Sequence, residues 1–150
     1  MNIEISQRDA VCADIEWLEA FYESIMRPYY VELNCEWDDT KFREYFDPAL
    51  TKIIQAEGID IGMLKVEERD DCIYLGDLQI ASEYRNKGIG THLIKIVIRS
   101  AILVHKPVRL RVLNGNPARN LYLRLGFRET HFLDNAWMME RSTDKIIAAL

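Results

Sequence analysis

The sequence predicts a mixed α/β (α+β) fold, with a mostly antiparallel central sheet of about seven strands and about four flanking helices. Two kinds of periodicity lead to this prediction. Some segments alternate apolar and polar residues, and others repeat apolar residues at helical spacing. Their order is strand, two helices, three strands, helix, strand, helix and two strands, which is not the regular alternation of a doubly wound sheet. The 150 residues suffice for one domain, 1–150, with a sizeable core.

The first part of the chain predicts one strand and two helices. Asn2–Ser6 alternates apolar and polar side chains, as a first strand does. Apolar residues then recur at helical spacing after Asp9, and Pro28 is expected to end or bend this helix. These residues are Val11, Ile15, Leu18, Phe21, Tyr22 and Ile25. A second, shorter helix is expected to begin at Trp37–Asp39 and to stop before Pro48.

Three strands and a helix are expected in the middle of the chain. Lys52–Ala56 and Ile59–Val66 are separated by a Glu-Gly pair, which is a short hairpin signal. A polar turn leads into a further strand at Ile73–Ile80. After a loop with two glycines, the most apolar window of the chain, Ile89–Val104, predicts a helix.

The last third predicts a strand, a helix and two strands. Val108–Leu113 alternates apolar residues with arginine, as a strand does. Asn116 and Pro117 make a good helix start, because Asn caps free N–H groups and Pro suits the first helical position. Gly126 is expected to end this helix. The final strands are expected at Phe127–Phe132 and Trp137–Glu140.

The composition restricts the partners and the compartment. A net charge of −5 and a pI near 5.2 argue against nucleic acid as the main partner. Cys12, Cys35 and Cys72 form no C-x-x-C pair and are expected to be reduced thiols. Neither a signal peptide nor a bilayer-spanning segment is visible, so we expect a cytoplasmic protein without a membrane partner, and a homodimer stays open. No cluster of His, Cys and carboxylates has metal-ligand spacing, so no metal is predicted.

The segment Arg85–Thr91 (RNKGIGT) predicts an anion site. It lies between a predicted strand and a predicted helix, where the free N–H groups of a first helical turn and the helix dipole favour an anion, most often a phosphate. Gly88 and Gly90 allow the backbone to approach a ligand closely, because glycine carries no Cβ. Arg85 and Lys87 add positive charge, so a phosphorylated cofactor is expected.

Two other phosphate-binding motifs fit this segment poorly. A Walker loop needs Gly-Lys followed by Ser or Thr, whereas Gly90 is followed by Thr91 and His92. The dinucleotide fingerprint needs a third glycine at the position of Leu93.

Two segments resemble the motifs of one enzyme family. Residues 78–91, LQIASEYRNKGIGT, resemble the acetyl-CoA-binding motif of the GNAT superfamily of N-acetyltransferases. Residues 116–127, NPARNLYLRLGF, are similar to its second motif, an Asn, an Ala and a Leu-Tyr followed by Gly-Phe. The motifs occur in the expected order, with one helix and one strand between them. The resemblance implies the GNAT-like acyl-CoA N-acyltransferase fold over nearly the whole chain.

The resemblance implies acetyl-CoA, or coenzyme A, as the cosubstrate. The backbone of Leu78, Gln79 and Ile80 would then pair with the pantetheine arm. The pyrophosphate would lie on the segment that contains Asn86, Lys87, Gly88, Ile89, Gly90 and Thr91, with Arg85 at the first position of the motif. Asn116 matches a residue that commonly contacts the cofactor, although it is also explained as a helix cap.

The resemblance also implies the reaction. A primary amine would attack the thioester directly, with Tyr122 as the general acid toward the CoA thiolate. A phenol (pKa about 10) and a thiol (pKa about 8.5) are reasonably matched for this transfer. The alternative role of Tyr122 is to pack on the sheet. An alternative function, a non-catalytic sensor or subunit that binds CoA or acyl-CoA, stays open.

The motifs do not assign a general base. Some relatives place a Glu near the position of Arg111, and arginine cannot accept the proton. Asp77, on the preceding strand, is a candidate, and a solvated strand carboxylate is the plain alternative. The remaining titratable residues are weaker candidates or expected surface residues: Tyr74, His131, His92 and His105.

Acidic and aromatic residues gather between the first two predicted helices. They are Glu32, Glu36, Asp38 and Asp39 with Tyr29, Tyr30 and Trp37. Such residues attract a cationic amine by charge and cation–π contact. Acidic residues are equally typical of a solvated helix start, and we favour this plainer interpretation. The acceptor stays open between a small polyamine, an amino sugar, an amino acid, an antibiotic and a protein N-terminus.

Overall fold

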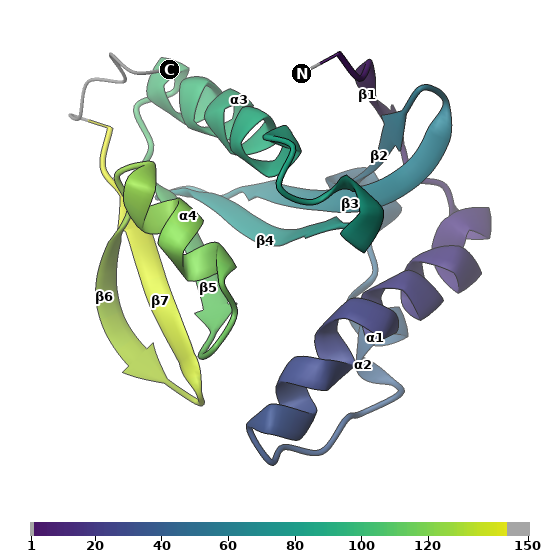
Figure 1. Cartoon of the computed structure of the whole chain (residues 1–150). Helices are drawn as coiled ribbons and strands as arrows, with labels where there is room; N and C mark the ends of the chain where they lie inside the picture. Colours follow the sequence, from purple (N-terminus) through teal and green to yellow (C-terminus); the bar gives the residue numbers. More distant parts are fainter. Residues whose placement is uncertain (1, 144–150) are drawn as a thin grey trace. The chain divides into compact units, whose positions relative to one another are not determined.

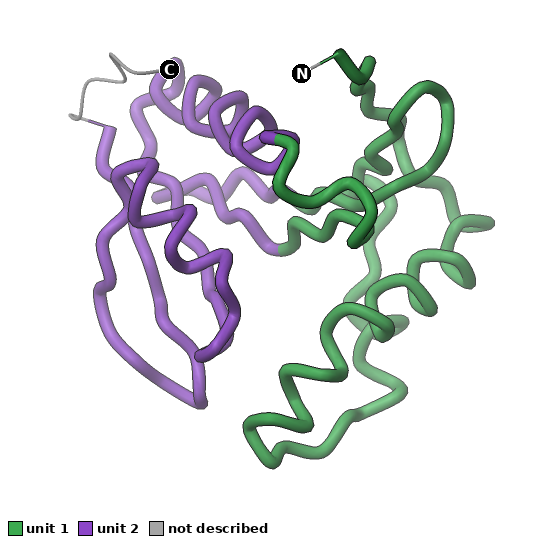
Figure 2. Tube along the Cα trace, viewed as in Figure 1, with its two compact units in different colours: residues 1–65, 77–87 green, residues 66–76, 88–150 purple. Residues whose placement is uncertain are grey.

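The computed structural model describes residues 2–143, which form the elements labelled in Figure 1. Its strands follow the sheet order β1-β2-β3-β4-β5-β7-β6. The chain forms two compact units: residues 1–65 and 77–87 make unit 1, and residues 66–76 and 88–150 make unit 2 (Figure 2). The predicted fold class, a mixed seven-stranded sheet with four α-helices, is confirmed. The single domain over 1–150 stays a prediction.

Unit 1 is built on an antiparallel meander of strands. They are β1 (Ile5–Asp9), β2 (Thr51–Ala56) and β3 (Ile59–Glu68), of which β3 extends to the start of unit 2. Between β2 and β3, Glu57 and Gly58 have φ values of 50° and 82°, as in the type I′ turn that matches the twist of a hairpin. The strand expected at Asn2–Ser6 is displaced: β1 lies over residues 5–9, because pairing with β2 fixes its ends and local alternation does not.

The helices of unit 1 cover the hydrophobic side chains of this meander. They are α1 (Ile15–Glu32) and α2 (Lys41–Tyr45), with short 3-10 turns η1 (Cys12–Asp14), η2 (Pro48–Leu50) and η3 (Ser82–Tyr84). Leu18 of α1 is fully buried with Ile53 and Met63 of the strands. Four partly buried aromatic residues pack against this cluster: Phe21, Tyr22, Phe42 and Phe46. The packing holds α1 and α2 against β2 and β3.

The sequence predicts that Pro28 ends or bends the first helix. Pro28 does not end it, because α1 continues through Pro28 to Glu32. Proline lacks an N–H donor and its ring crowds the carbonyl one turn before it, but the amides beyond it still find carbonyl acceptors. The backbone N of Leu33 donates to Tyr29 O at 3.1 Å, for example. Asn34, with φ of 55°, follows the end of the helix.

The second helix is shorter than its hydrophobic pattern indicates. It begins at Lys41 instead of Trp37–Asp39. The Asp38 carboxylate accepts hydrogen bonds from the backbone N and the hydroxyl of Thr40 at 2.9 and 2.6 Å. This local turn replaces a first helical turn, as Asp side chains often do.

Unit 2 contains the start of β4 and the rest of the sheet. Its elements are β4 (Ile73–Ile80, which passes into unit 1 after Gly76), α3 (Ile89–Leu103), β5 (Val108–Leu113), α4 (Ala118–Arg124), β6 (Arg128–Leu133) and β7 (Ala136–Arg141). β4 pairs with β5 in parallel over Ile73–Leu75, and α3 is the connection that a parallel pair requires. β5 pairs antiparallel with β7, and β7 with β6.

The N-terminus of α3 is fixed by the burial of one helix face. Its buried residues recur at helical spacing: Ile89, Leu93, Ile94, Val97, Ile98 and Ala101. Because Ile89 is itself buried, the first turn of α3 has a defined position. Within residues 2–143, no helix combines the length and the apolar character that crossing a membrane requires.

Candidate active site

The loop after β4 turns through left-handed backbone at two positions. Asn86 has a φ of 60°, and Gly88, the N-cap of α3, has a φ of 82°. Arg85 is extended, and its Nε donates to the backbone O of Ile80 at 3.0 Å. This bond ties the first cation of the loop to the end of β4.

The first turn of α3 offers free N–H groups. Gly88 has no side chain to cap it, and the turn contains no acidic residue. Gly88 O accepts the backbone N of His92 at 3.0 Å, so the N–H groups of Ile89, Gly90 and Thr91 precede this first helical bond. Free N–H groups and the positive end of the helix dipole favour an anion, so this geometry is consistent with the anion site, which stays a prediction.

Two glycines near these elements differ in whether the protein itself requires them. A Cβ built on Gly90 lies 3.7 Å from Leu121 Cδ2, an ordinary contact, so protein packing does not require glycine there. A Cβ built on Gly62 of β3 lies 2.3 Å from the backbone O of Gln79 of β4, which no structure tolerates. Gly62 therefore permits close approach of β3 to the later part of β4, whereas no described side chain or backbone atom explains the glycine at position 90.

The second motif forms α4 in unit 2. Asn116 Oδ1 accepts the backbone N of Ala118 at 2.9 Å, so the predicted capping role is present. The side-chain N–H groups of Asn116 have no partner among the described residues. Tyr122 is buried, with 7% of its surface exposed, and its ring contacts Phe127 edge to face at 5.5 Å. The packing alternative for Tyr122 is thus realised in part.

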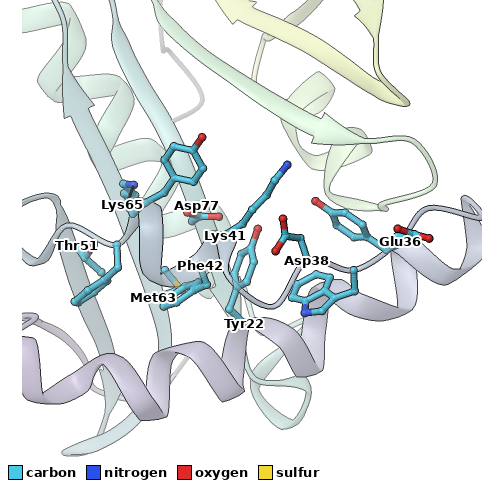
Figure 3. Close-up of a pocket in the computed structure, with 13 residues that line it drawn as sticks. Tyr22, Glu36, Asp38, Lys41, Phe42, Thr51, Met63, Lys65 and Asp77 are labelled. Carbon is cyan, nitrogen blue, oxygen red and sulfur yellow. Dashed lines mark hydrogen bonds between the residues drawn. The ribbon is translucent and has the colours of Figure 1, made fainter.

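Unit 1 contains a pocket of about 190 Å³ between its helices and strands (Figure 3). Six aromatic residues line it: Tyr22, Tyr30, Trp37, Phe42, Tyr45 and Phe46. Five charged residues also line it: Glu36, Asp38, Lys41, Lys65 and Asp77. Figure 3 shows Asp77 and Lys65 toward one end, Glu36 at the other, and Lys41 and Asp38 between them. An apolar wall with a few charged groups is typical of a small-molecule site.

Asp77 is the titratable group with the most altered acidity in this pocket. Burial raises the pKa of its carboxyl group from 3.8 to about 7, and the positive charge of Lys65 lowers this pKa in part. Lys65 Nζ is held by the backbone O of Tyr45 at 2.8 Å. No described residue forms a hydrogen bond or ion pair with the Asp77 carboxyl group. A carboxyl group with a pKa near 7 is suited to accept a proton at neutral pH.

The chain matches the model of the acetyltransferase (GNAT) family over residues 18–127, which is more than half of its length. It belongs to this family. The protein is accordingly an acyltransferase, and its recognition from the two sequence motifs is confirmed. No curated protein matches the chain significantly.

Solved structures of GNAT proteins share this fold at low identity. The PaiA N-acetyltransferase from Thermoplasma acidophilum, solved with coenzyme A, is 18% identical with a TM-score of 0.75, and the match covers 93% of this chain and 99% of that one. A GNAT acetyltransferase from Staphylococcus aureus Mu50 is 20% identical with a TM-score of 0.71, over 94% and 100% of the two chains. An Arabidopsis thaliana protein, solved with the bisubstrate analogue CoA-Ac-MVNAL, is 18% identical with a TM-score of 0.67, over 92% and 98%.

Some of the residues that the sequence suggested for this GNAT protein line the pocket in unit 1, and others do not. Asp77 lines the pocket in unit 1, and so do Glu36 and Asp38 of the acidic group, with Tyr30 and Trp37. The other acidic residues of that group, Glu32 and Asp39, do not line it. Of the weaker base candidates, Tyr74 lies under the guanidinium of Arg69, and His131 is exposed on β6. Among residues 2–143, no group of three or more His, Cys, Asp or Glu residues is arranged to hold a metal.

Several pocket residues were missed at the level of sequence. Lys41 and Lys65 carry no motif, and Tyr22 and Phe42 fit the helical spacing of plain core residues. The sequence also carries a signal at Gly62, which does not line the pocket. A glycine inside a strand pattern indicates close approach of another backbone, here that of Gln79 on β4.

Proposed function

We propose that this protein transfers an acetyl group from acetyl-CoA to a primary amine by direct attack, with Asp77 as the general base and Tyr122 as the general acid. The observation that carries the proposal is the uncapped first turn of α3 behind the RNKGIGT loop, in a chain of the acetyltransferase (GNAT) family. The pocket that contains Asp77 is the proposed acceptor site.

The residues present fit the phosphates and the pantetheine arm of acetyl-CoA. The segment Asn86–Thr91 combines left-handed backbone, two glycines and free N–H groups without a nearby acidic residue of the helix, as a pyrophosphate requires. Leu78–Ile80 lies beyond Ile73–Leu75, the part of β4 that pairs with β5, and would offer backbone groups to the pantetheine arm. The side-chain N–H groups of Asn116 would be a further contact. The coenzyme A in the Thermoplasma acidophilum neighbour supports this assignment.

Asp77 is proposed to take the proton that the acceptor must lose. A primary amine is protonated at neutral pH, and its nitrogen attacks only after it releases a proton. With a pKa of about 7, the Asp77 carboxyl group is partly ionised at neutral pH and basic enough to accept that proton. The new C–N bond then forms at the acetyl carbon while the C–S bond of the thioester breaks.

Tyr122 is proposed to give its phenolic proton to the departing sulfur. The reference pKa of a phenol, about 10, lies close enough to that of a thiol, about 8.5, for the transfer. The products are the N-acetyl amine and the free thiol of coenzyme A. The first proton of the substrate ammonium leaves through Asp77 and is the proton released overall. The attacking nitrogen loses a second proton as the amide forms, and this proton restores the phenol of Tyr122.

Release of free thiol from acetyl-CoA, measured with a panel of amines, tests the proposal. Tyr122→Phe is expected to lower kcat by about 10²- to 10⁴-fold, the usual contribution of a general acid, while coenzyme A binding by calorimetry stays unchanged. Asp77→Asn is expected to lower kcat and to remove the loss of activity below about pH 7. Binding of coenzyme A without Tyr122-dependent thiol release from any amine would instead identify a non-catalytic binding module.

A further inference from the structure

The pocket of unit 1 presents free charges of both signs to a small ligand. Its charged residues are Glu36, Asp38, Asp77, Lys41 and Lys65 (Figure 3). Two carboxylates face two ammonium groups when Asp77 carries its proton, so the pocket is then electrically balanced. A ligand with two positive charges and no negative charge would gain little from such a lining.

The two lysines differ in the hydrogen bonds that their ammonium groups form within the protein. Lys65 Nζ donates to Tyr45 O at 2.8 Å and lies close enough to lower the pKa of Asp77. The ammonium of Lys41 forms neither a hydrogen bond nor an ion pair with any described residue, although its positive charge helps to lower the pKa of Asp38. An ammonium group has three donors, so Lys41 can still donate to an anionic group of a ligand.

The negative groups differ in the same way. Asp38 accepts two hydrogen bonds from Thr40, and these hold its pKa below the usual range, so it is already part of a turn. Asp77 has no such donors among residues 2–143. The charged groups without a hydrogen-bond partner among residues 2–143 therefore include a proton acceptor, Asp77, toward one end of the pocket, and a cation, Lys41, nearer its middle (Figure 3).

We propose that the acetyl acceptor is a small zwitterionic amine, of the amino acid class, whose carboxylate binds Lys41 while its ammonium faces Asp77. This inference rests on the proposed function, because it takes the pocket as the acceptor site. It excludes polyamines, which lack an anion, and peptide N-termini, in which an amide replaces the carboxylate beside the amine.

The size and the lining of the pocket restrict the rest of the acceptor. The pocket offers about 190 Å³, which is room for several water molecules and so for a small organic ligand. The aromatic rings of Tyr22, Trp37 and Phe42 favour an apolar or aromatic side chain there.

Matched pairs of amines that differ only in the carboxylate test the inference. The pairs are L-phenylalanine and phenethylamine, L-leucine and isoamylamine, and L-methionine and 3-methylthiopropylamine, with spermidine and L-phenylalaninamide as further acceptors. The amino acid of at least one pair is expected to show a kcat/KM about tenfold or more above that of its decarboxylated partner, as a charge-assisted hydrogen bond supplies. Equal or better acetylation of every decarboxylated amine would overturn the inference and leave the proposed function intact.

Lys41→Gln tests whether this preference comes from the assigned side chain. The variant is expected to lower kcat/KM for the preferred amino acid about tenfold and to change it less than about twofold for the decarboxylated partner. Lys95→Gln is the matched control, because Lys95 lies on α3 and does not line the pocket. An unchanged preference in Lys41→Gln would contradict the assignment.

A binding measurement separates this inference from the proposed reaction. Calorimetry with the protein saturated with coenzyme A is expected to show that L-phenylalanine, or the preferred amino acid, binds more tightly than its decarboxylated partner, and that Lys41→Gln removes the difference. Such binding without thiol release would support the pocket chemistry and refute the proposed function. The absence of both binding and transfer with every amino acid tested would overturn the inference.

Discussion

Replacement of Asp77 by Asn is expected to stabilise the protein at neutral pH and to change its stability little below about pH 4. Burial raises the pKa of this carboxyl group from 3.8 to about 7, so between these values the folded chain holds a proton that the unfolded chain has released. By linkage, the Asp77 contribution lowers stability as pH rises through this window and becomes constant above about pH 7. Asparagine does not titrate, so the variant escapes this loss.

The expected size of the effect follows from the same pKa values. Each pKa unit corresponds to 1.36 kcal/mol, so the rise from 3.8 to about 7 corresponds to about 4 kcal/mol. This is an upper limit, because Asp77 is half-buried and water in the pocket screens its charge. Removal of the proposed base lowers activity at the same time, so the variant exchanges function for stability.

Urea unfolding of both proteins at about pH 5, 6, 7 and 8 measures the difference. The stability gap between Asp77→Asn and wild type is expected to grow with pH up to about pH 7 and then to stay constant. Asp134→Asn is the matched control, because Asp134 is exposed in the β6–β7 turn with a φ of 52°, which asparagine also adopts. A gap that does not depend on pH, or a variant less stable than wild type at about pH 8, would refute the reasoning.

Three further substitutions test the neighbouring parts of the site. Gly90→Glu is expected to abolish coenzyme A binding in calorimetry, because its side chain would clash with the phosphates and repel their negative charge. Gly90→Ala is expected to keep the fold, because its Cβ makes only an ordinary contact. Unchanged affinity in Gly90→Glu would rule out the phosphate site. Lys65→Met removes the positive charge that lowers the pKa of Asp77, so the acidic limb of the kcat/KM profile is expected to move to higher pH. An acidic limb that stays in place would exclude an effect of Lys65 on the pKa of Asp77. Gly62→Ala brings a Cβ within 2.3 Å of Gln79 O. It is expected to lower the free energy of unfolding, measured by urea, by about 1–3 kcal/mol or more. An unchanged urea midpoint would show that β3 and β4 can move apart to accept the Cβ.

The elements around the cofactor motifs were predictable because their signals are local. The strand Ile73–Ile80 has the predicted bounds, and so does Val108–Leu113. The helix after the loop begins at Ile89, as predicted, behind a glycine that adopts a positive φ without steric cost. Asn116 caps α4 by a hydrogen bond to a residue two positions along the chain. Each of these features depends on a few consecutive residues.

Two of the errors lie where a distant partner overrides a local preference. The first strand follows its pairing with β2 instead of its own alternation. Packing against the β2–β3 cluster holds α1 as one helix through Pro28, although proline disfavours a helix interior. The cost of one missing hydrogen bond is thus offset by burial of the amphipathic face.

The sequence by itself determined the family and the form of the loop from Arg85 to Thr91, because glycine spacing, a helix start and two short motifs act within one stretch of chain. Only the tertiary structure decided that Asp77 shares a pocket with Lys41 and Lys65, and that burial raises its pKa to about 7. These residues lie on three different elements: Lys41 on α2, and Lys65 and Asp77 on the consecutive strands β3 and β4. Burial and electrostatic neighbours are properties of three-dimensional packing, so a carboxylate that looks solvated in a strand pattern became the proposed base.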